Sequence, residues 1–283
     1  MTILFFLLFQ FSETVNVSYV LFNVKVFDKD KSLVTNLKKD DFNLYIDLHP
    51  VKIEHFSKVS MEPQSILLMV DSSGSMGTGD LWEKVEILIK EIENYIKEKD
   101  EIGIFIFQSD SYRLIKDFKI KEPLLPFLDE IKPWGKTALY DSLSYSSVYF
   151  NKTSNKNRRI ILITDTHDNF SKQEPEKVVN SLIKTSFPCH IFALKQTEQE
   201  PLEIDFLKLL SKYTNGSLHI CLTREEIIKE VENCWEAFSK EYLIGFAPDQ
   251  KSVLKYHTVI VEAKNKNYKV ETRKGYYGQT PKR

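Results

Sequence analysis

The segment Asp71-Ser-Ser73-Gly-Ser75-Met76 gathers one carboxyl group and several hydroxyl groups directly after an apolar run. Gly74 permits a sharp turn, which would point the side chains of Asp71, Ser73 and Ser75 at one place. Their oxygens are hard donors of the kind that Mg²⁺, Mn²⁺ and Ca²⁺ prefer. With so few carboxylates, a bound Mg²⁺ would keep water ligands and an open position, where an acidic group of a partner can bind. Alone, the pattern also fits a plain helix N-cap.

Two later features strengthen the metal hypothesis. Gly135-Lys-Thr137 stands just before the start of a predicted helix, and Asp165 directly follows the apolar run Arg159–Thr164. Asp71 follows an apolar run in the same way. Ligands of parallel sheets bind outside the carboxyl ends of the strands, near the point where the strand order reverses. Asp71 and Asp165 are therefore both expected at that edge.

These three features together resemble the metal-ion-dependent adhesion site of von Willebrand factor type A domains, and the resemblance covers residues 61–240. It implies that Ser73, Ser75 and Thr137 supply hydroxyl ligands. It also implies that Asp71 and Asp165 bind the metal directly or through water. The carboxylate of a protein partner would then complete an octahedral shell.

The middle of the sequence alternates between predicted strands and helices. Continuous apolar runs predict buried strands, and apolar residues at spacings of three and four predict helices. The predicted strands are Ser65–Val70, Ile102–Phe107, Arg159–Thr164, His190–Leu194 and Leu218–Leu222. The predicted helices are Leu81–Lys99, Thr137–Phe150, Glu174–Thr185, Pro201–Tyr213 and one that starts at the capping box Thr223-Arg-Glu-Glu226 and buries Ile227, Val231, Cys234, Trp235, Phe238 and Tyr242. This alternation predicts an α/β fold with a doubly wound, Rossmann-like, mainly parallel sheet and helices on both faces.

The two ends of the chain have a different pattern. Alternating residues predict strands at Val17–Phe27, Asp41–Asp47, Tyr242–Phe246, Tyr256–Ala263 and Tyr268–Arg273. Single strands are not stable alone, so the two ends are expected to pair in one small β-sandwich-like domain. The predicted division is a split β domain of residues 14–60 and 241–279, with the von Willebrand factor type A domain of residues 61–240 inserted between its halves.

The flanks resemble a narrower group, the bacterial secreted proteins related to von Willebrand factor type A. The matching segments are Val-Thr-Asn-Leu-Lys-Lys-Asp-Asp-Phe42, Ile-Glu-His-Phe56, Tyr-Leu-Ile-Gly-Phe246 and Arg273-Lys-Gly-Tyr-Tyr277. One departure concerns the metal site. The family commonly has Asp-Gly after the strand, whereas this chain has Asp165-Thr166-His167. The missing glycine is expected to alter the loop beside the metal.

Composition limits the function classes. The 283 residues are 42% apolar and 28% charged, which are ordinary globular values. A formal net charge of −1 argues against nucleic acid as the main partner. Three cysteines do not make a disulfide framework. Cys234 is expected to be a buried free thiol on a helix, and a bridge between Cys189 and Cys221 is left open.

The first residues, Met1-Thr-Ile-Leu-Phe-Phe-Leu-Leu-Phe-Gln-Phe11, form an apolar segment that is too short to span a bilayer. It fits the core of a secretory signal, although a basic start and a small-x-small cleavage site are missing. A buried first strand is the alternative. We expect a signal peptide in residues 1–13, a secreted or periplasmic protein, and no stable membrane span after signal removal.

Three residues near the predicted site have more than one interpretation. His167 fits a metal ligand or a pH sensor, and it also fits a loop histidine without a special role. Trp134 fits a binding face, or packing on the edge of the sheet. Asp141, on the helix that follows Thr137, is expected to accept structural hydrogen bonds rather than to bind the metal.

Enzymatic alternatives fit the sequence less well. Gly135-Lys-Thr137 resembles the end of a phosphate-binding loop, but Glu130 stands where that motif needs a glycine. A haloacid-dehalogenase-like phosphotransferase would use Asp71 as nucleophile, with Thr164 or a lysine in support. Ser73 stands where that family has its acid/base aspartate. A serine hydrolase lacks the Gly-x-Ser-x-Gly motif. A vestigial metal site that only stabilises the loop is a further, non-catalytic alternative.

The sequence thus predicts a non-enzymatic, divalent-cation-dependent adhesion or scaffolding module. The expected cofactor is Mg²⁺, or Mn²⁺ or Ca²⁺ in its place, held by Asp71, Ser73, Ser75, Thr137 and Asp165. The expected partner is a protein that offers an acidic side chain. The identity of that protein and the oligomeric state of this one are unknown.

Overall fold

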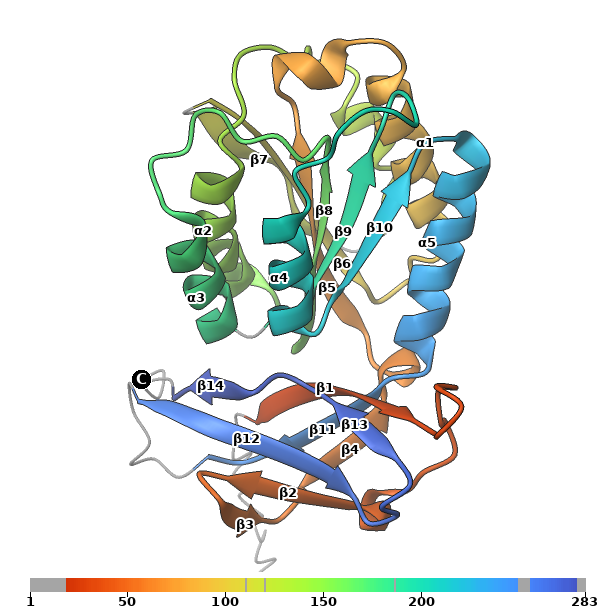
Figure 1. Ribbon diagram of the computed structural model, residues 1–283, viewed down its shortest axis with the longest axis vertical. Helices are drawn as coiled ribbons and strands as arrows, with labels where there is room; N and C mark the ends of the chain where they lie inside the picture. Colours follow the sequence, from red (N-terminus) through yellow and green to blue (C-terminus); the bar gives the residue numbers. More distant parts are fainter. Residues whose placement is uncertain (1–18, 110, 120, 186, 249–254, 279–283) are drawn as a thin grey trace, which may run out of the picture.

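The computed structural model describes residues 19–109, 111–119, 121–185, 187–248 and 255–278. The predicted signal segment, residues 1–13, lies outside these residues. The described chain forms an α/β domain and a smaller β domain, stacked along the long axis of the molecule (Figure 1). Within this part of the chain, no helix is both long enough and apolar enough to cross a membrane.

A six-stranded sheet with the order β10-β9-β8-β5-β6-β7 forms the centre of the α/β domain. The strands are β5 (Gln64–Asp71), β6 (Glu101–Gln108), β7 (Ser111–Lys119), β8 (Asn157–Thr164), β9 (Cys189–Leu194) and β10 (Ser217–Cys221). All pairs are parallel except β6 with β7. From β5 the chain adds β6 and then β7 toward one edge of the sheet, and it later returns to add β8 on the opposite flank of β5. The strand order therefore reverses between β5 and β8.

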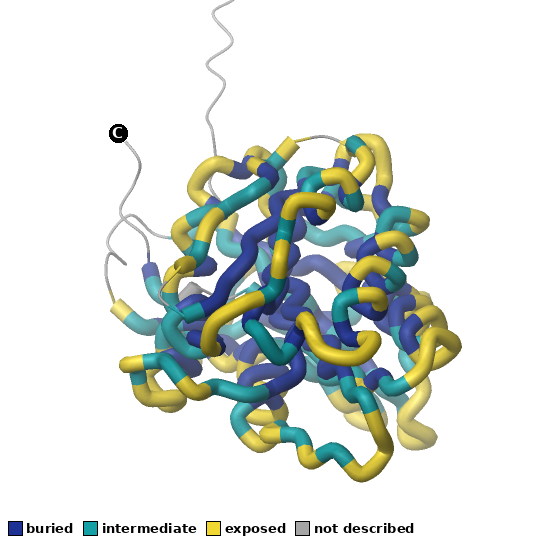
Figure 2. The backbone as a smooth tube through the Cα atoms, turned by 90° about the horizontal axis from the view of Figure 1, so that it is seen from above, coloured by how far each residue is buried: buried dark blue, intermediate teal, exposed yellow. Residues whose placement is uncertain are grey.

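Helices cover both faces of this sheet (Figure 1). They are α1 (Leu81–Glu93), α2 (Leu139–Tyr149), α3 (Pro175–Thr185), α4 (Asp205–Thr214) and α5 (Arg224–Ser239). Along β5, Ile66, Leu68 and Val70 belong to the core under α1 and α5, whereas Leu67 and Met69 belong to the core under α2, α3 and α4. A central strand with a core on each face needs a continuous apolar run, and this is why β5 has no polar alternation. Seen from above, the buried strands are surrounded by exposed helix faces and loops (Figure 2).

Two four-stranded sheets, β13-β1-β11-β4 and β14-β12-β2-β3, make up the β domain. The strands are β1 (Val20–Phe27), β2 (Phe42–Ile46), β3 (His49–Val51), β4 (His55–Lys58), β11 (Tyr242–Phe246), β12 (Tyr256–Ala263), β13 (Lys269–Glu271) and β14 (Gly275–Tyr277). Strand β1 pairs with β11 and β13, and β2 pairs with β12, so both sheets combine the two ends of the chain. The short 3-10 helices of the chain are η1 (Lys39–Asp41), η2 (Val59–Met61), η3 (Gly74–Gly77), η4 (Leu125–Phe127) and η5 (Phe150–Lys152).

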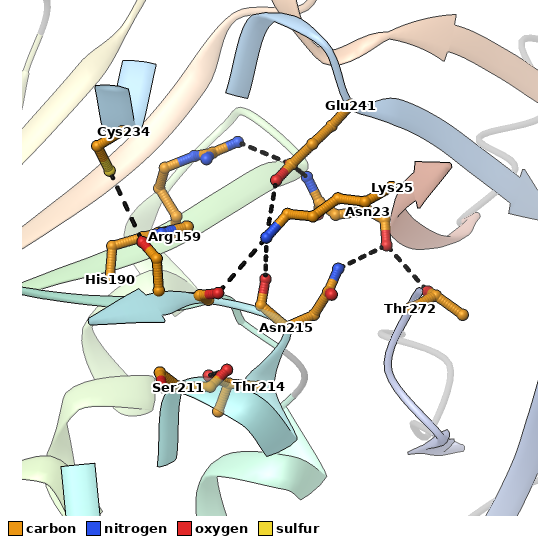
Figure 3. A network of polar contacts seen from close by, with 12 residues as sticks. Asn23, Lys25, Arg159, His190, Ser211, Thr214, Asn215, Cys234, Glu241 and Thr272 are labelled. Carbon is orange, nitrogen blue, oxygen red and sulfur yellow. Dashed lines mark hydrogen bonds and ion pairs between the residues drawn. The ribbon is translucent and has the colours of Figure 1, made fainter. Parts of the chain in front are cut away.

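A buried polar network joins the two domains at Glu241, which lies between α5 and β11 (Figure 3). The Asn23 amide donates to Glu241 Oε2 at 2.9 Å. The Lys25 ammonium lies 3.6 Å from Glu241 Oε1, and the buried guanidinium of Arg159 lies 3.9 Å from Oε2. Asn215, at the end of α4, donates to the carbonyl of Asn23 at 3.0 Å. The network therefore ties the first strand of the β domain to the lower end of the α/β sheet.

The predicted fold class is confirmed, namely a mainly parallel α/β sheet together with a small β domain from both chain ends. The capping box at Thr223 also forms, since its side chain accepts from Glu226 N and Glu226 reaches back. Strand β7 was not predicted. It carries polar residues at alternate positions, because it lies at the edge of the sheet with one side toward solvent.

Two local predictions are wrong. Helix α1 ends at Glu93 rather than Lys99. The residues after it turn toward β6, and the Asp100 carboxylate holds this turn beside the start of β5, because it accepts from Lys97 N and from Gln64 N. Tyr242 is not buried by the last helix but belongs to β11, where its hydroxyl donates to Val34 O. All three cysteines are free and buried, which confirms the prediction for Cys234 and answers the question left open for Cys189 and Cys221. Cys189 starts β9, whereas Cys221 ends the neighbouring parallel strand, so the two thiols lie at opposite ends and cannot pair.

Candidate metal site at the carboxyl edge of the sheet

Asp71 is the last residue of β5 and is fully buried at the point where the strand order reverses. Each of its carboxylate oxygens accepts one hydrogen bond. Oδ1 accepts from the backbone N–H of Ser73 at 2.9 Å, and Oδ2 accepts from the hydroxyl of Thr164, the last residue of β8, at 2.8 Å. These bonds fix the carboxylate between the two central strands.

The turn after Asp71 brings two hydroxyl groups together. Ser73 Oγ and Ser75 Oγ lie 3.2 Å apart at the start of η3. The backbone N–H of Gly74 donates to Gly135 O at 2.9 Å, and a Cβ atom at Gly74 would lie only 3.1 Å from that oxygen. Glycine at position 74 therefore allows the turn to approach the loop that leads to Thr137.

Backbone N–H groups of that loop donate hydrogen bonds to the turn and to the residue after β6. Trp134 N donates to Ser72 O at 3.0 Å, and Lys136 N donates to Ser109 Oγ at 2.9 Å. Gly135 has φ +77°, a left-handed conformation that suits glycine. Thr137 follows, 1% exposed, and its N–H donates to the side chain of Asn169 at 2.9 Å. The segments of Ser73, Thr137 and Asp165 therefore meet at one edge of the sheet.

Asp165 is 1% exposed and directly follows β8. Its Oδ1 accepts from the backbone N–H of His167 at 3.3 Å. Thr166, between these two residues, has φ +79°, which is an unusual conformation for a β-branched residue. Its hydroxyl accepts from Glu203 N at 2.9 Å. The threonine thus keeps the left-handed turn that a glycine would adopt easily, and a hydrogen bond to the loop before α4 helps to hold it there.

The electrostatics of the site centre on the two aspartates. Burial is the largest cause that raises the pKa of Asp71, and the negative charge of Asp165 is the second. The hydrogen bonds from Ser73 and Thr164 lower it, and the net result is a pKa of about 7. A cation between the two carboxylates would remove the cost of burying Asp71 in its charged form. The described residues contain no cluster of three or more His, Cys, Asp or Glu placed to hold a metal. An ion at this edge would therefore need hydroxyl and water ligands, which suits Mg²⁺ and its preference for hard oxygen.

The neighbouring residues that the sequence drew attention to have different roles. The carboxylate of Asp141 accepts from Lys172 N and Gln173 N, so it stabilises a loop as expected. The His167 ring lies 3.5 Å from the Glu203 carboxylate, a partner that the sequence did not suggest. Trp134 is 60% exposed and does not pack into the sheet edge. The part that Thr164 plays as donor to Asp71 was not predicted for a metal site, because it depends on the pairing of β5 with β8.

The fold defines a Rossmann-like α/β domain whose hydroxyl-rich edge lies at the reversal of strand order. Residues 66–167 match the family model described as von Willebrand factor type A domain. The α/β domain is therefore similar to von Willebrand factor type A domains over these residues. No curated protein matches the chain.

Solved structures share the fold at low sequence identity. A von Willebrand factor type A protein from Catenulispora acidiphila is 11% identical, with a TM-score of 0.55 over 94% of this chain and 75% of that chain. An aerotolerance-related membrane protein from Bacteroides fragilis gives 16% identity and a TM-score of 0.48 over 61% of this chain and 98% of the other. The pilus adhesin SpaC from Lactobacillus rhamnosus GG gives 12% and 0.49 over 71% and 34%. The first likeness extends the shared fold beyond the α/β domain, and the other two are too weak to add to it.

Proposed function

We propose that this protein binds a protein partner through a divalent cation held at the carboxyl edge of the α/β sheet. Asp71, Ser73, Ser75, Thr137 and Asp165 would hold Mg²⁺, or Mn²⁺ or Ca²⁺ in its place, and a partner carboxylate would complete the shell. The observation that carries the proposal is the pair of buried aspartates beside two hydroxyls, with the pKa of Asp71 raised by burial and by Asp165.

The charge balance explains why such a site would seek a partner. Asp71 and Asp165 would bind the cation directly or through water, while the hydroxyls of Ser73, Ser75 and Thr137 add no charge. Each carboxylate oxygen of Asp71 already accepts a hydrogen bond, from Ser73 or from Thr164, and these bonds partly compensate its negative charge. A cation held this way stays electrophilic. An external carboxylate is its natural further ligand, because hard cations prefer charged oxygen.

Recognition fits the geometry better than turnover. A phosphotransferase with Asp71 as nucleophile would need a second carboxylic acid close by in the turn to move protons. Ser73 stands at that place, and its backbone N–H binds Asp71 instead. Thr164, suggested as a support for phosphate, donates to Asp71 itself. The residues at this edge can hold and orient a cation, but the turn from Asp71 to Ser75 offers no second carboxylic acid at the position that this phosphotransferase family uses.

The test is calorimetric titration of Mg²⁺ and Mn²⁺ into protein stripped with a chelator. Wild type is compared with Asp71→Ala and with Asp117→Ala, a matched loss of a half-exposed carboxylate on β7, away from the site. We expect one saturable site in the wild type and in Asp117→Ala, and none in Asp71→Ala. Equal heats in all three proteins, or none in any, would count against the proposal and favour a vestigial site.

A further inference from the structure

A surface hollow of about 490 Å³ lies next to the candidate metal site, between the top of β6 and β7 and the segment that leads to Trp134. We call it the Trp134 groove. Its apolar lining comes from Ile106, Ile131 and Trp134, and its charged lining from Arg113, Lys132 and Glu130. We propose that this groove is a second recognition subsite, which binds an acidic and an apolar side chain of the same partner segment whose carboxylate meets the cation. This inference rests on the proposed function.

Hydrogen bonds connect the Trp134 groove to the turn of the candidate metal site. Trp134 N donates to Ser72 O at 3.0 Å, next to Ser73. The side-chain amide of Gln108 satisfies both of its groups when its nitrogen donates to Ser72 and its oxygen accepts from the Trp134 indole N–H. The indole is therefore tied to the turn that holds Ser73. A partner segment leaving the cation on this side would meet the Trp134 ring first.

Trp134 has the properties of a binding anchor. Its ring is 60% exposed although its backbone N–H and indole N–H are both bonded. A tryptophan held in one orientation loses little freedom when a partner covers it, and such residues contribute strongly to binding. Ile131, partly buried beside it, extends the apolar surface. This part of the groove fits an apolar side chain of the partner.

The charges of the groove select for an acidic neighbour. Arg113 and Lys132 are exposed, and among the described residues neither has a carboxylate within 4.0 Å. Lys116, three residues further along β7, is by contrast paired with Glu122 at 3.1 Å. Glu130 supplies one negative charge against the two cations of the lining. An acidic side chain placed between Arg113 and Lys132 would complement this excess.

The partner is therefore an extended peptide or loop with two acidic residues and an apolar residue between them. One carboxylate would bind the cation, the apolar side chain would cover Trp134, and the second carboxylate would lie at Arg113 and Lys132. Each subsite alone would bind its part of the segment weakly. A segment that reaches both subsites binds more tightly, because the second contact forms within the same complex. This gives specificity for a pattern of residues rather than for any single carboxylate.

The experiment selects binders from a displayed library of random peptides on wild-type protein in Mg²⁺, with elution first by EDTA and then by acid, so that EDTA-resistant binders are also recovered. We expect enriched peptides to carry two acidic residues around an apolar one. The affinity of these peptides is then measured for Arg113→Glu/Lys132→Glu, for Trp134→Ala, and for the charge-conserving control Arg113→Lys/Lys132→Arg. The first two variants should weaken binding at least about tenfold, and the control should stay within about threefold.

Titration of Mg²⁺ alone separates the two proposals. All of these variants should bind Mg²⁺ as the wild type does. Enriched peptides with a single acidic residue, unaffected by charge reversal and by Trp134→Ala, would overturn the subsite and leave the cation site standing. Binding that resists EDTA but needs Arg113 and Lys132 would also overturn it, because the groove would then act without the cation. Failure of the wild type to bind Mg²⁺ would instead overturn the proposed function itself.

Discussion

The hydroxyl of Thr164 donates to Asp71 Oδ2 at 2.8 Å and thereby joins the last residues of β8 and β5. This contact lies within the buried core of the candidate site and links the two strands between which the sheet reverses its order. The bond lowers the pKa of Asp71, which stabilises the charged form of this carboxyl group against burial.

Replacement of Thr164 by valine should therefore lower stability and weaken cation binding. The isosteric change removes the donor and leaves Asp71 Oδ2 buried without it, at a cost of about 1–3 kcal/mol. Urea unfolding in EDTA measures the stability, and calorimetry measures the Mg²⁺ affinity. The exposed Thr197 gives the control Thr197→Val. Equal unfolding midpoints for the two variants would show that the bond does not stabilise Asp71.

The raised pKa of Asp71 predicts how the stability of metal-free protein depends on pH. In the folded state this carboxyl group holds its proton up to a pH of about 7, whereas its ordinary pKa is 3.8. Between these values the folded state binds more protons than the unfolded state, so the contribution of Asp71 to stability falls as the pH rises. The contribution is most favourable below pH 4 and is lost above pH 7.

Bound Mg²⁺ should replace the proton and reverse this loss. We expect the rise in Tm on adding Mg²⁺ to be larger at pH 8 than at pH 5.5. In EDTA, the difference in stability between wild type and Asp71→Asn should change in favour of the variant as the pH rises, since other titrating groups are common to both. A difference that stays constant from pH 5 to pH 8 would contradict the raised pKa.

The hydroxyl ligands can be separated from a hydroxyl that only supports the turn. Ser73→Ala and Thr137→Ala should each weaken Mg²⁺ binding at least about tenfold, because each removes one ligand. The matched control is Ser72→Ala, whose hydroxyl bonds to Phe107 O at 3.2 Å and not to the Ser73–Ser75 pair. Calorimetry gives the affinities. If Ser72→Ala weakened binding as much as the other two, the assigned ligand set would be wrong.

The departure at Thr166 should have little effect on the site. Thr166→Gly would relieve about 1–2 kcal/mol of left-handed strain and lose one hydrogen bond to Glu203 N worth about 1 kcal/mol. We expect net stability within about 1 kcal/mol of the wild type and an unchanged Mg²⁺ affinity. Thermal unfolding and titration check both values. A large loss of stability would mean that the hydroxyl, rather than the backbone turn, determines the path of this loop.

Glu241 should be the most sensitive residue at the domain junction. Glu241→Gln leaves the charges of Lys25 and Arg159 without their buried partner, which typically costs about 3–5 kcal/mol. The control is Glu236→Gln on the exposed side of α5, whose carboxylate is 58% exposed and pairs with Lys240. Urea unfolding compares the two. Similar midpoints would show that the network in Figure 3 contributes little to stability.

The sequence by itself determined the class of fold and the place of the site. The runs that became β5 and β8 are apolar without alternation, which is typical of central parallel strands, and parallel strands bring their carboxyl ends to one edge. Asp71 and Asp165 were expected together for this reason alone. The role of these aspartates and of Ser73, Ser75 and Thr137 as metal ligands stays a prediction, which the titrations above address.

The tertiary structure decided what depends on contacts between distant segments. No local pattern distinguishes Tyr242 as the end of a helix from Tyr242 as the start of a strand, and its bond to Val34 across the β domain settles the matter. The same holds for the left-handed Thr166, held by Glu203, and for the exposed Trp134, tied to Ser72. The spacing of apolar residues along the sequence is a local property of the chain, and it predicts single helices and strands. Hydrogen bonds between loops form only after the sheet has brought the loops together, so the sequence pattern does not contain them.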